Sequence, residues 1–203
     1  MRSFLITLII LFTYTNTRAQ NSIEVLAGNK EAHYINYYDK NFDSTGNWNF
    51  FNLNRFTVNY KNSALNTVSL EAQITYSLNP WLGFSAGGGF YGELFIPNIG
   101  LSLSYLNKKE NLFSQIYPTV GYFEGQFAPS ILGIIGYTPK LSQNLNFSSQ
   151  LLFSADQNES TQILRVGVTF KKTFHFGIGI DMSHTFETKN LNINIGPFIR
   201  FNF

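Results

Sequence analysis

The sequence predicts an all-β protein, an antiparallel transmembrane β-barrel of about twelve strands, and three observations lead to this fold class. The first is the final stretch, residues 191–203 (LNINIGPFIRFNF), where apolar side chains keep one parity to the last residue. Mostly asparagine, glycine and Arg200 occupy the other parity. Because side chains alternate across a strand, one face is apolar and the other is mainly polar. A barrel wall between lipid and a polar lumen requires this pattern.

The second observation is the composition. The chain of 203 residues is 17% aromatic and only 13% charged, and it contains no cysteine. An average soluble domain carries about a quarter charged residues, and the polar faces here are mainly Ser, Asn, Gly, Thr and Gln instead. The net charge of +2 gives no indication of a nucleic-acid partner. The lack of cysteine excludes disulfides and a lipid-anchored N-terminal cysteine.

The third observation is a targeting segment at the N-terminus. Arg2 precedes an apolar run over residues 4–12, and residues 17–19 form a small-x-small cleavage site. The run is shorter than the roughly 20 residues that a membrane-spanning helix needs. We therefore expect a cleaved signal peptide over residues 1–19 and a single outer-membrane β-barrel domain over residues 20–203.

The same period of two identifies the preceding strands. We expect them at residues 50–60, 67–78, 82–90, 99–105, 116–122, 127–137, 145–153, 161–171 and 174–184. With the final strand they make ten. The stretch 127–137 is apolar on both faces.

The first of these strands carries an irregular pattern. Phe51 and Leu53 share one parity at its start, whereas Phe56 and Val58 share the other further on. An extra residue at 54–55, in a β-bulge, would keep all four side chains on the lipid face. The sequence therefore predicts a bulge there.

Residues 20–48 leave two alternatives open. They form either one more hairpin, with strands 22–27 and 31–41, or a plug or lid for a ten-stranded barrel. Bacterial barrels have even strand numbers, which both alternatives satisfy. Ile23, Val25 and Ala27 occupy alternate positions, and the final strand needs a partner to close the barrel. These two points favour twelve strands.

The connections predict the orientation. Tight turns are expected at residues 79–80, 107–111, 142–144 and 171–173. Longer connections are expected at 92–98, 123–126, 155–160 and 185–189. Since barrels have short periplasmic turns and longer outer loops, the first set and the C-terminus are assigned to the periplasm.

Charged residues identify the lumen face. An arginine or lysine on the lipid face near mid-membrane costs about 2–4 kcal/mol, so the parity that holds the charges should face inward. The predicted lumen-lining residues are Arg55, Glu71, Arg165, His175, Asp181 and Arg200. We interpret them as a salt-bridge and amide network that plugs the lumen. The alternative is a narrow pore lined by the same residues.

The end of the chain resembles the C-terminal assembly signal of bacterial outer-membrane proteins. The residues that carry the resemblance are Ile195, Ile199, Phe201 and Phe203, while Pro197 departs from the usual filler. The resemblance implies recognition by the barrel-assembly machinery during biogenesis. The Asn-, Phe- and Tyr-rich strands, with the segments EVLAGNK and FFNLNRF, are similar to uncharacterised barrels of Bacteroidota.

Enzymatic chemistry has one candidate constellation. Some small outer-membrane barrels are lipid A deacylases or phospholipases, which use a Ser-His-acid arrangement at the outer rim. Ser183, His184 and Glu187 come nearest to it here. Adjacent strand residues point to opposite faces, so Ser183 and His184 cannot pair unless the chain turns there. We expect no catalytic residue, no metal site and no cofactor.

The leading hypothesis is a non-enzymatic, porin-like barrel of the bacterial outer membrane with a largely plugged lumen and a structural or surface-interaction role. A narrow channel for small polar solutes is the first alternative, and a rim-active lipid hydrolase is the second. The expected partners are outer-membrane lipid, the assembly machinery and, for the channel, a small polar solute.

Overall fold

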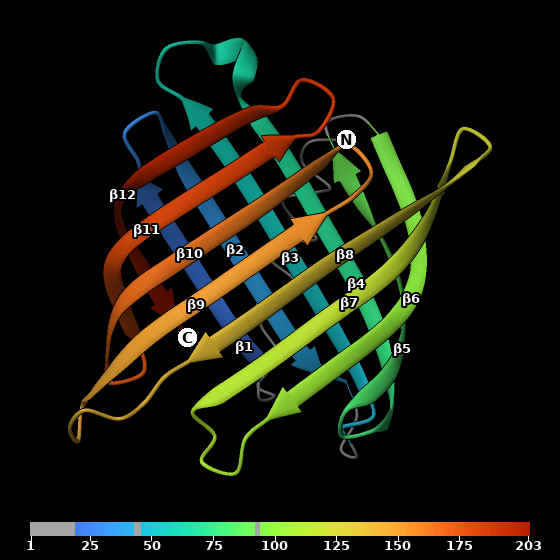
Figure 1. Cartoon of the computed structure of the whole chain (residues 1–203). Helices are drawn as coiled ribbons and strands as arrows, with labels where there is room; N and C mark the ends of the chain where they lie inside the picture. Colours follow the sequence, from blue (N-terminus) through green and yellow to red (C-terminus); the bar gives the residue numbers. More distant parts are fainter. Residues whose placement is uncertain (1–18, 43–45, 92–93) are drawn as a thin grey trace, which may run out of the picture.

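The protein forms a closed barrel of antiparallel strands (Figure 1). The structure, a computed structural model, describes residues 19–42, 46–91 and 94–203. The twelve strands in this part of the chain are β1 (Ala19–Ala27), β2 (Glu31–Asn41), β3 (Trp48–Asn59), β4 (Thr67–Asn79), β5 (Leu82–Tyr91), β6 (Leu94–Leu106), β7 (Leu112–Phe123), β8 (Gln126–Tyr137), β9 (Leu145–Ala155), β10 (Glu159–Phe170), β11 (Phe174–Thr185) and β12 (Asn190–Asn202). A short 3₁₀ helix, η1 (Ser63–Leu65), lies between β3 and β4. No described helix is long and apolar enough to cross a membrane.

Each strand pairs with its neighbours in the chain, and β1 closes the ring against β12 from Ser22↔Asn202 to Leu26↔Phe198. The prediction of twelve strands is confirmed. The region at residues 20–48 supplies the hairpin β1–β2, not a plug. Because the strand number is even, Ala19 and Asn202 lie at one end of the barrel, which we call the terminal end. The opposite end, which carries η1, is the distal end (top in Figure 1).

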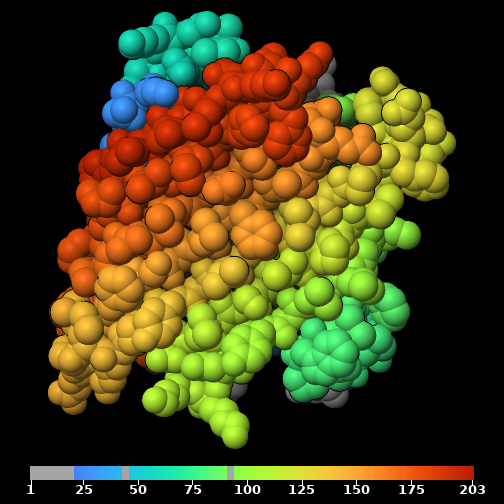
Figure 2. Space-filling view, in the orientation of Figure 1, coloured from blue at the N-terminus to red at the C-terminus, as the bar shows by residue number. Residues whose placement is uncertain are grey.

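The two faces of the wall differ as the alternation requires. Large apolar side chains such as Phe84 (56% exposed), Ile99 (69%) and Ile178 (53%) point outward. Inward positions on the same strands hold small or polar residues such as Ser85 and Ser102, which are buried. Figure 2 shows the outer face of β7–β12, where side chains of neighbouring strands cover the wall in diagonal bands.

Exposed aromatic residues gather at both ends of the barrel. At the terminal end they include Trp48, Trp81, Tyr105, Phe174 and Phe203, and at the distal end Tyr60, Phe90, Phe95, Tyr122 and Phe127. Several pack in pairs, such as Phe90 with Phe95 at 4.7 Å between ring centroids. Two such girdles are typical of barrels whose ends lie at the two membrane–water boundaries.

The predicted bulge at residues 54–55 is wrong. The pairing of β2 with β3 runs without interruption from Glu31↔Asn59 to Asn41↔Asn49. Phe51 (3% exposed) and Leu53 (8%) therefore share the inward parity of Arg55. The prediction failed because it assigned every large apolar side chain to lipid, whereas part of this lumen is apolar. The register shift recorded in this part of the barrel lies in β4, between Ser77 and Asn79.

The predicted difference in connection length is also wrong. The described turns at the terminal end span residues 80–81, 107–111, 138–144 and 171–173. The described distal connections span 28–30, 60–66, 124–125, 156–158 and 186–189, and most of them are equally short. The distal strands continue almost to their hairpin tips, so loop length does not distinguish the two ends. The predicted signal peptide falls outside the described residues, apart from Ala19 at the start of β1.

Candidate functional site

An ion-pair network occupies one side of the barrel interior. It comprises Glu24, Glu31, His33, Arg55, Arg165, Asp181 and Arg200, from strands β10–β12 and β1–β3. These six strands are consecutive around the ring, because β12 pairs with β1. The network therefore depends on closure of the barrel, which brings together residues far apart in the sequence.

Arg165 is the centre of this network and is fully buried, at 0% exposure. Its Nε donates to Glu24 Oε1 at 2.6 Å, and its Nη1 donates to Asp181 Oδ1 and to the carbonyl oxygen of Leu164. The guanidinium also lies 5.6 Å from the ring centroid of Phe198. A buried cation is tolerated only with partners of this kind, because an unpaired one carries a large desolvation cost.

Glu24 and Arg200 join the two strands that close the barrel. They are directly opposed in the register of β1 and β12. Arg200 donates from Nε at 2.9 Å and from Nη2 at 2.6 Å to Glu24 Oε2. Glu24 thus pairs with one guanidinium through each carboxylate oxygen.

His33 lies at the distal side of the network. Its Nδ1 contacts Asp181 Oδ2, and its Nε2 is 2.8 Å from Glu31 Oε1. Arg55 Nη2 approaches the same Asp181 oxygen at 3.9 Å. The network as a whole holds three carboxylates, three guanidiniums and the imidazole of His33.

A second group of side chains, which we call the apolar bridge, crosses the rest of the lumen. It comprises Tyr37, Phe51, Tyr117, Ile134 and Leu152. The rings of Phe51 and Tyr117 stack with centroids 5.6 Å apart and planes at 27°, although three strands separate β3 from β7. Tyr37 packs edge-on against Phe51 at 5.4 Å.

The apolar bridge leaves little space between opposite walls. Strands β2 and β8 lie six positions apart in the ring of twelve, yet Tyr37 and Ile134 line the same void of about 10 Å³. A void of that size is at the lower limit for a single water molecule. The apolar bridge and the ion-pair network both lie in the lumen, on strands from different sides of the ring.

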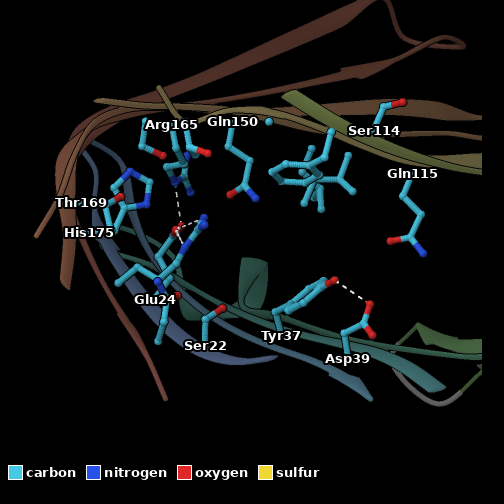
Figure 3. A pocket seen from close by; sticks show the side chains of 18 of the residues that line it. Ser22, Glu24, Tyr37, Asp39, Ser114, Gln115, Gln150, Arg165, Thr169 and His175 are labelled. Atoms are coloured by element: carbon cyan, nitrogen blue, oxygen red, sulfur yellow. Dashed lines mark hydrogen bonds and ion pairs between the residues drawn. The ribbon is translucent and has the colours of Figure 1, made fainter. Parts of the chain in front are cut away.

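A cavity of about 970 Å³ lies between the apolar bridge and the terminal end. Tyr37, Leu53, Ile134 and Arg165 line its inner end. Pro80, Glu110, Lys172 and Asn202 lie at the terminal-end turns and at the end of β12, and they line its mouth. Figure 3 shows Glu24, Arg165, Thr169 and His175 on one side of the cavity, Gln150 on the wall, and Tyr37 beside Asp39. We call this space the terminal cavity.

His175 contributes an unusual group to the terminal cavity. Its side chain is 3% exposed, and Nε2 has no hydrogen-bond partner in the protein. The ring stands at 90° to Phe198, with centroids 4.8 Å apart. In the register of the sheet, His175 lies between Thr169 and Arg200.

The predicted lumen-lining residues are placed as follows. Arg55, Arg165, Asp181 and Arg200 meet in the ion-pair network, and His175 lies beside it on the cavity side. Glu71 is half-buried on the inward parity of β4, opposite Leu53.

The residues of the predicted assembly signal all face outward. Ile195 (45% exposed), Ile199 (54%) and Phe201 (40%) lie on the lipid-facing parity of β12, and Phe203 (55%) follows it. Phe201 packs against Phe174 of β11 at 5.1 Å. Their role in assembly stays a prediction.

The interior roles of several residues were not predicted from the sequence. Glu24 and His33 were not recognised as partners of Arg165 and Asp181, although Ile23 and Val25 already indicated that Glu24 faces inward. Nothing local identifies the partner, because Glu24 and Arg165 are 141 positions apart. Phe51 of the apolar bridge was assigned to the lipid face, since its apolar character indicated lipid contact.

The structure does not bring the candidate catalytic residues Ser183 and His184 together. Both ring nitrogens of His33 lie against carboxylates. His184 points outward from β11 and packs on Phe186 at 5.4 Å, while Ser183 points inward. In the described ranges, no three or more His, Cys, Asp or Glu side chains are grouped so that they could hold a metal ion.

Comparison with known proteins identifies the fold. No family model matches this chain, and no curated protein matches it. Among solved structures, the NanC porin covers 91% of this chain with 98% of its own length, at 12% identity and a TM-score of 0.55. The KdgM porin, solved in complex with disordered oligogalacturonate, covers 91% with 99% of its length, at 9% identity and a TM-score of 0.51.

This chain has the porin-like fold of an outer-membrane β-barrel. Its location is the bacterial outer membrane, as the lipid-facing alternation and the aromatic girdles require. The identity to both porins is low, so the likeness concerns the fold.

Proposed function

We propose that the protein is a non-enzymatic outer-membrane barrel whose lumen is closed, with a structural or surface-interaction role. The observation that carries this proposal is the narrow gap between opposite walls, where Tyr37 of β2 and Ile134 of β8 line one void of about 10 Å³ and the rings of Phe51 and Tyr117 stack beside it. Beside it, Arg165 is at 0% exposure. A lumen filled by its own side chains in this way leaves no continuous path for a solute.

The charge balance supports a structural role for the network. Three guanidiniums and three carboxylates neutralise one another within the wall and lumen. The KdgM porin was solved with oligogalacturonate, a chain of carboxylates. Because the charges of this lumen are compensated, the lumen offers no net positive surface to a polyanion of this kind.

We place the terminal end in the periplasm. A chain exported by a signal peptide reaches the outer membrane from the periplasmic side. Insertion of β-hairpins leaves both termini of an even-stranded barrel on the side of entry. The proposal includes the signal peptide at residues 1–19, the assembly signal at Ile195, Ile199, Phe201 and Phe203, and an origin in Bacteroidota.

Conductance in planar lipid bilayers tests the closed lumen. We expect no steady conductance from the wild-type barrel, because side chains fill its cross-section. The double variant Phe51→Ala/Tyr117→Ala removes the stacked rings and is expected to produce steady single-channel currents. Phe56→Ala, which removes an outward-facing ring from the same strand, is the matched control and should remain silent. Steady current through the wild type would contradict the proposal.

A narrow channel is the second candidate, favoured by the terminal cavity, which extends from the mouth to the apolar bridge. If the wild type conducts, the passage must run through the region of the ion-pair network. Its conductance would then change in Arg165→Ala and stay unaltered in Phe56→Ala.

A further inference from the structure

The terminal cavity is larger than a closed, structural barrel requires. Its volume of about 970 Å³ lies at the upper end of the range for small-molecule sites. A lumen that served only to stabilise the wall could be filled with side chains along its whole length, as it is at the apolar bridge. The cavity instead extends inward as far as Leu53 and Ile134, which line it.

The walls of the cavity offer uncharged hydrogen-bonding groups. Ser148 and Gln150 on β9 and Thr169 on β10 line one wall of the cavity. Gln115 on β7 lies across from Tyr37 (Figure 3). Hydroxyl and amide side chains both donate and accept hydrogen bonds. They therefore suit a ligand whose polar groups, like hydroxyls, can both donate and accept hydrogen bonds.

Four charged side chains that line the cavity, Glu24, Asp39, Arg165 and Arg200, have partners within the protein. Glu24 accepts from Arg165 and Arg200. Asp39 accepts from Tyr37 Oη at 3.1 Å and from Asn49 Nδ2 at 2.5 Å. A charged ligand would have to compete with these pairs, whereas a neutral ligand would not.

His175 presents the clearest sign of a built site. Its Nε2 is buried, has no protein partner and belongs to a residue that lines the cavity. The ring nitrogen is a donor in one tautomer and an acceptor in the other. A hydroxyl group can pair with either one.

The inner end of the cavity is apolar. Leu53, Ile134, Leu152 and the ring of Tyr37 line it. The C–H faces of a sugar ring or similar polyol can pack on such a surface while its hydroxyls reach the walls. The cavity thus combines polar sides with an apolar floor.

We propose that the terminal cavity binds a neutral, hydroxyl-rich solute of up to about trisaccharide size, entering from the terminal end. His175 and Gln150 hydrogen-bond its hydroxyls, and the apolar floor contacts a ring face. This site goes beyond the proposed structural role, because a closed barrel needs no ligand.

Titration calorimetry on the full barrel in detergent micelles tests this site. The probes are maltotriose and raffinose, which are neutral, and trigalacturonate, which is anionic and of similar size. We expect saturable binding of at least one neutral probe and weaker or no binding of trigalacturonate. Gln150→Ala/His175→Ala removes two hydrogen-bonding groups and should weaken the binding about tenfold.

Gln73→Ala is the matched control, because Gln73 also points inward, from β4, but does not line the cavity. It should bind like the wild type, and circular dichroism should show all variants folded. The proposal is overturned if neither neutral probe binds, if trigalacturonate binds more tightly, or if Gln150→Ala/His175→Ala binds unchanged. Binding and conductance are separate readouts: a conducting barrel that binds the probe refutes the closed lumen and leaves this site standing.

Discussion

At the scale of single residues, Arg165 shows what a strand pattern can predict and where it stops. The alternation of β10 places Arg165 inward, because a lipid-facing arginine is too costly. The same argument placed Asp181 and Arg200. It could not find Glu24 or His33 as partners, because the pairing follows from the closure of β1 on β12 and not from any local pattern.

Removing Arg165 tests the energetic weight of the network. In Arg165→Ala, Glu24 loses one of its two cations and Asp181 loses its closest one, so buried carboxylates are left under-compensated. We expect a loss of about 3–5 kcal/mol in the free energy of unfolding, as for other broken buried pairs. Urea unfolding in lipid vesicles, followed by tryptophan fluorescence, measures it.

Lys172→Ala is the control for this change. Lys172 is an exposed cation at the mouth of the cavity, and its removal should alter the free energy of unfolding by less than about 1 kcal/mol. Similar losses in both variants would show that Arg165 has no special role.

At the scale of elements, the hairpin β1–β2 is held to β12 by an amide side chain as well as by strand pairing. Asn194 is 1% exposed, and its Oδ1 accepts from the backbone amides of Lys30 at 3.0 Å and Glu31 at 3.3 Å. Its Nδ2 donates to the carbonyl oxygen of Glu31 at 3.1 Å. A Cβ at Gly28 would lie 2.1 Å from Asn194 Oδ1, so the hairpin requires glycine there.

Asn194→Ala should therefore weaken the closing seam. It leaves the partly buried backbone groups of Lys30 and Glu31 without that partner, at a cost of about 1 kcal/mol. Amide hydrogen exchange in the hairpin is expected to rise, which NMR in micelles would detect. Asn192→Ala removes only an exposed bond to Lys30 Nζ and should leave exchange unchanged. Equal exchange in Asn194→Ala and the wild type would contradict this role.

At the scale of the whole molecule, the barrel class and the number of strands could be predicted, because a period of two is a local property of each strand. The inward direction of Phe51 could not be predicted, because an aromatic side chain suits either contact with lipid or a filled lumen. The choice depends on Tyr117, which meets Phe51 only because β3 and β7 curve around the same lumen. The predicted difference in connection length between the two ends was also wrong, because the distal strands extend almost to their hairpin tips.

We propose a lumen that is closed between the terminal cavity and the distal end. The chain contains no cysteine, so single cysteines can be introduced without background. Ser63→Cys in η1 reports the distal end, and Gln150→Cys reports the terminal cavity. Each variant is reconstituted into liposomes and treated outside with a charged, membrane-impermeant methanethiosulfonate reagent.

Ser63→Cys reacts only in barrels whose distal end faces outward, and this fraction measures the orientation. A closed lumen predicts that Gln150→Cys reacts only in the remaining barrels, so that the two labelled fractions add up to one. A continuous passage would let the reagent reach Gln150→Cys in both orientations. Labelling of nearly every Gln150→Cys barrel would contradict the closed lumen.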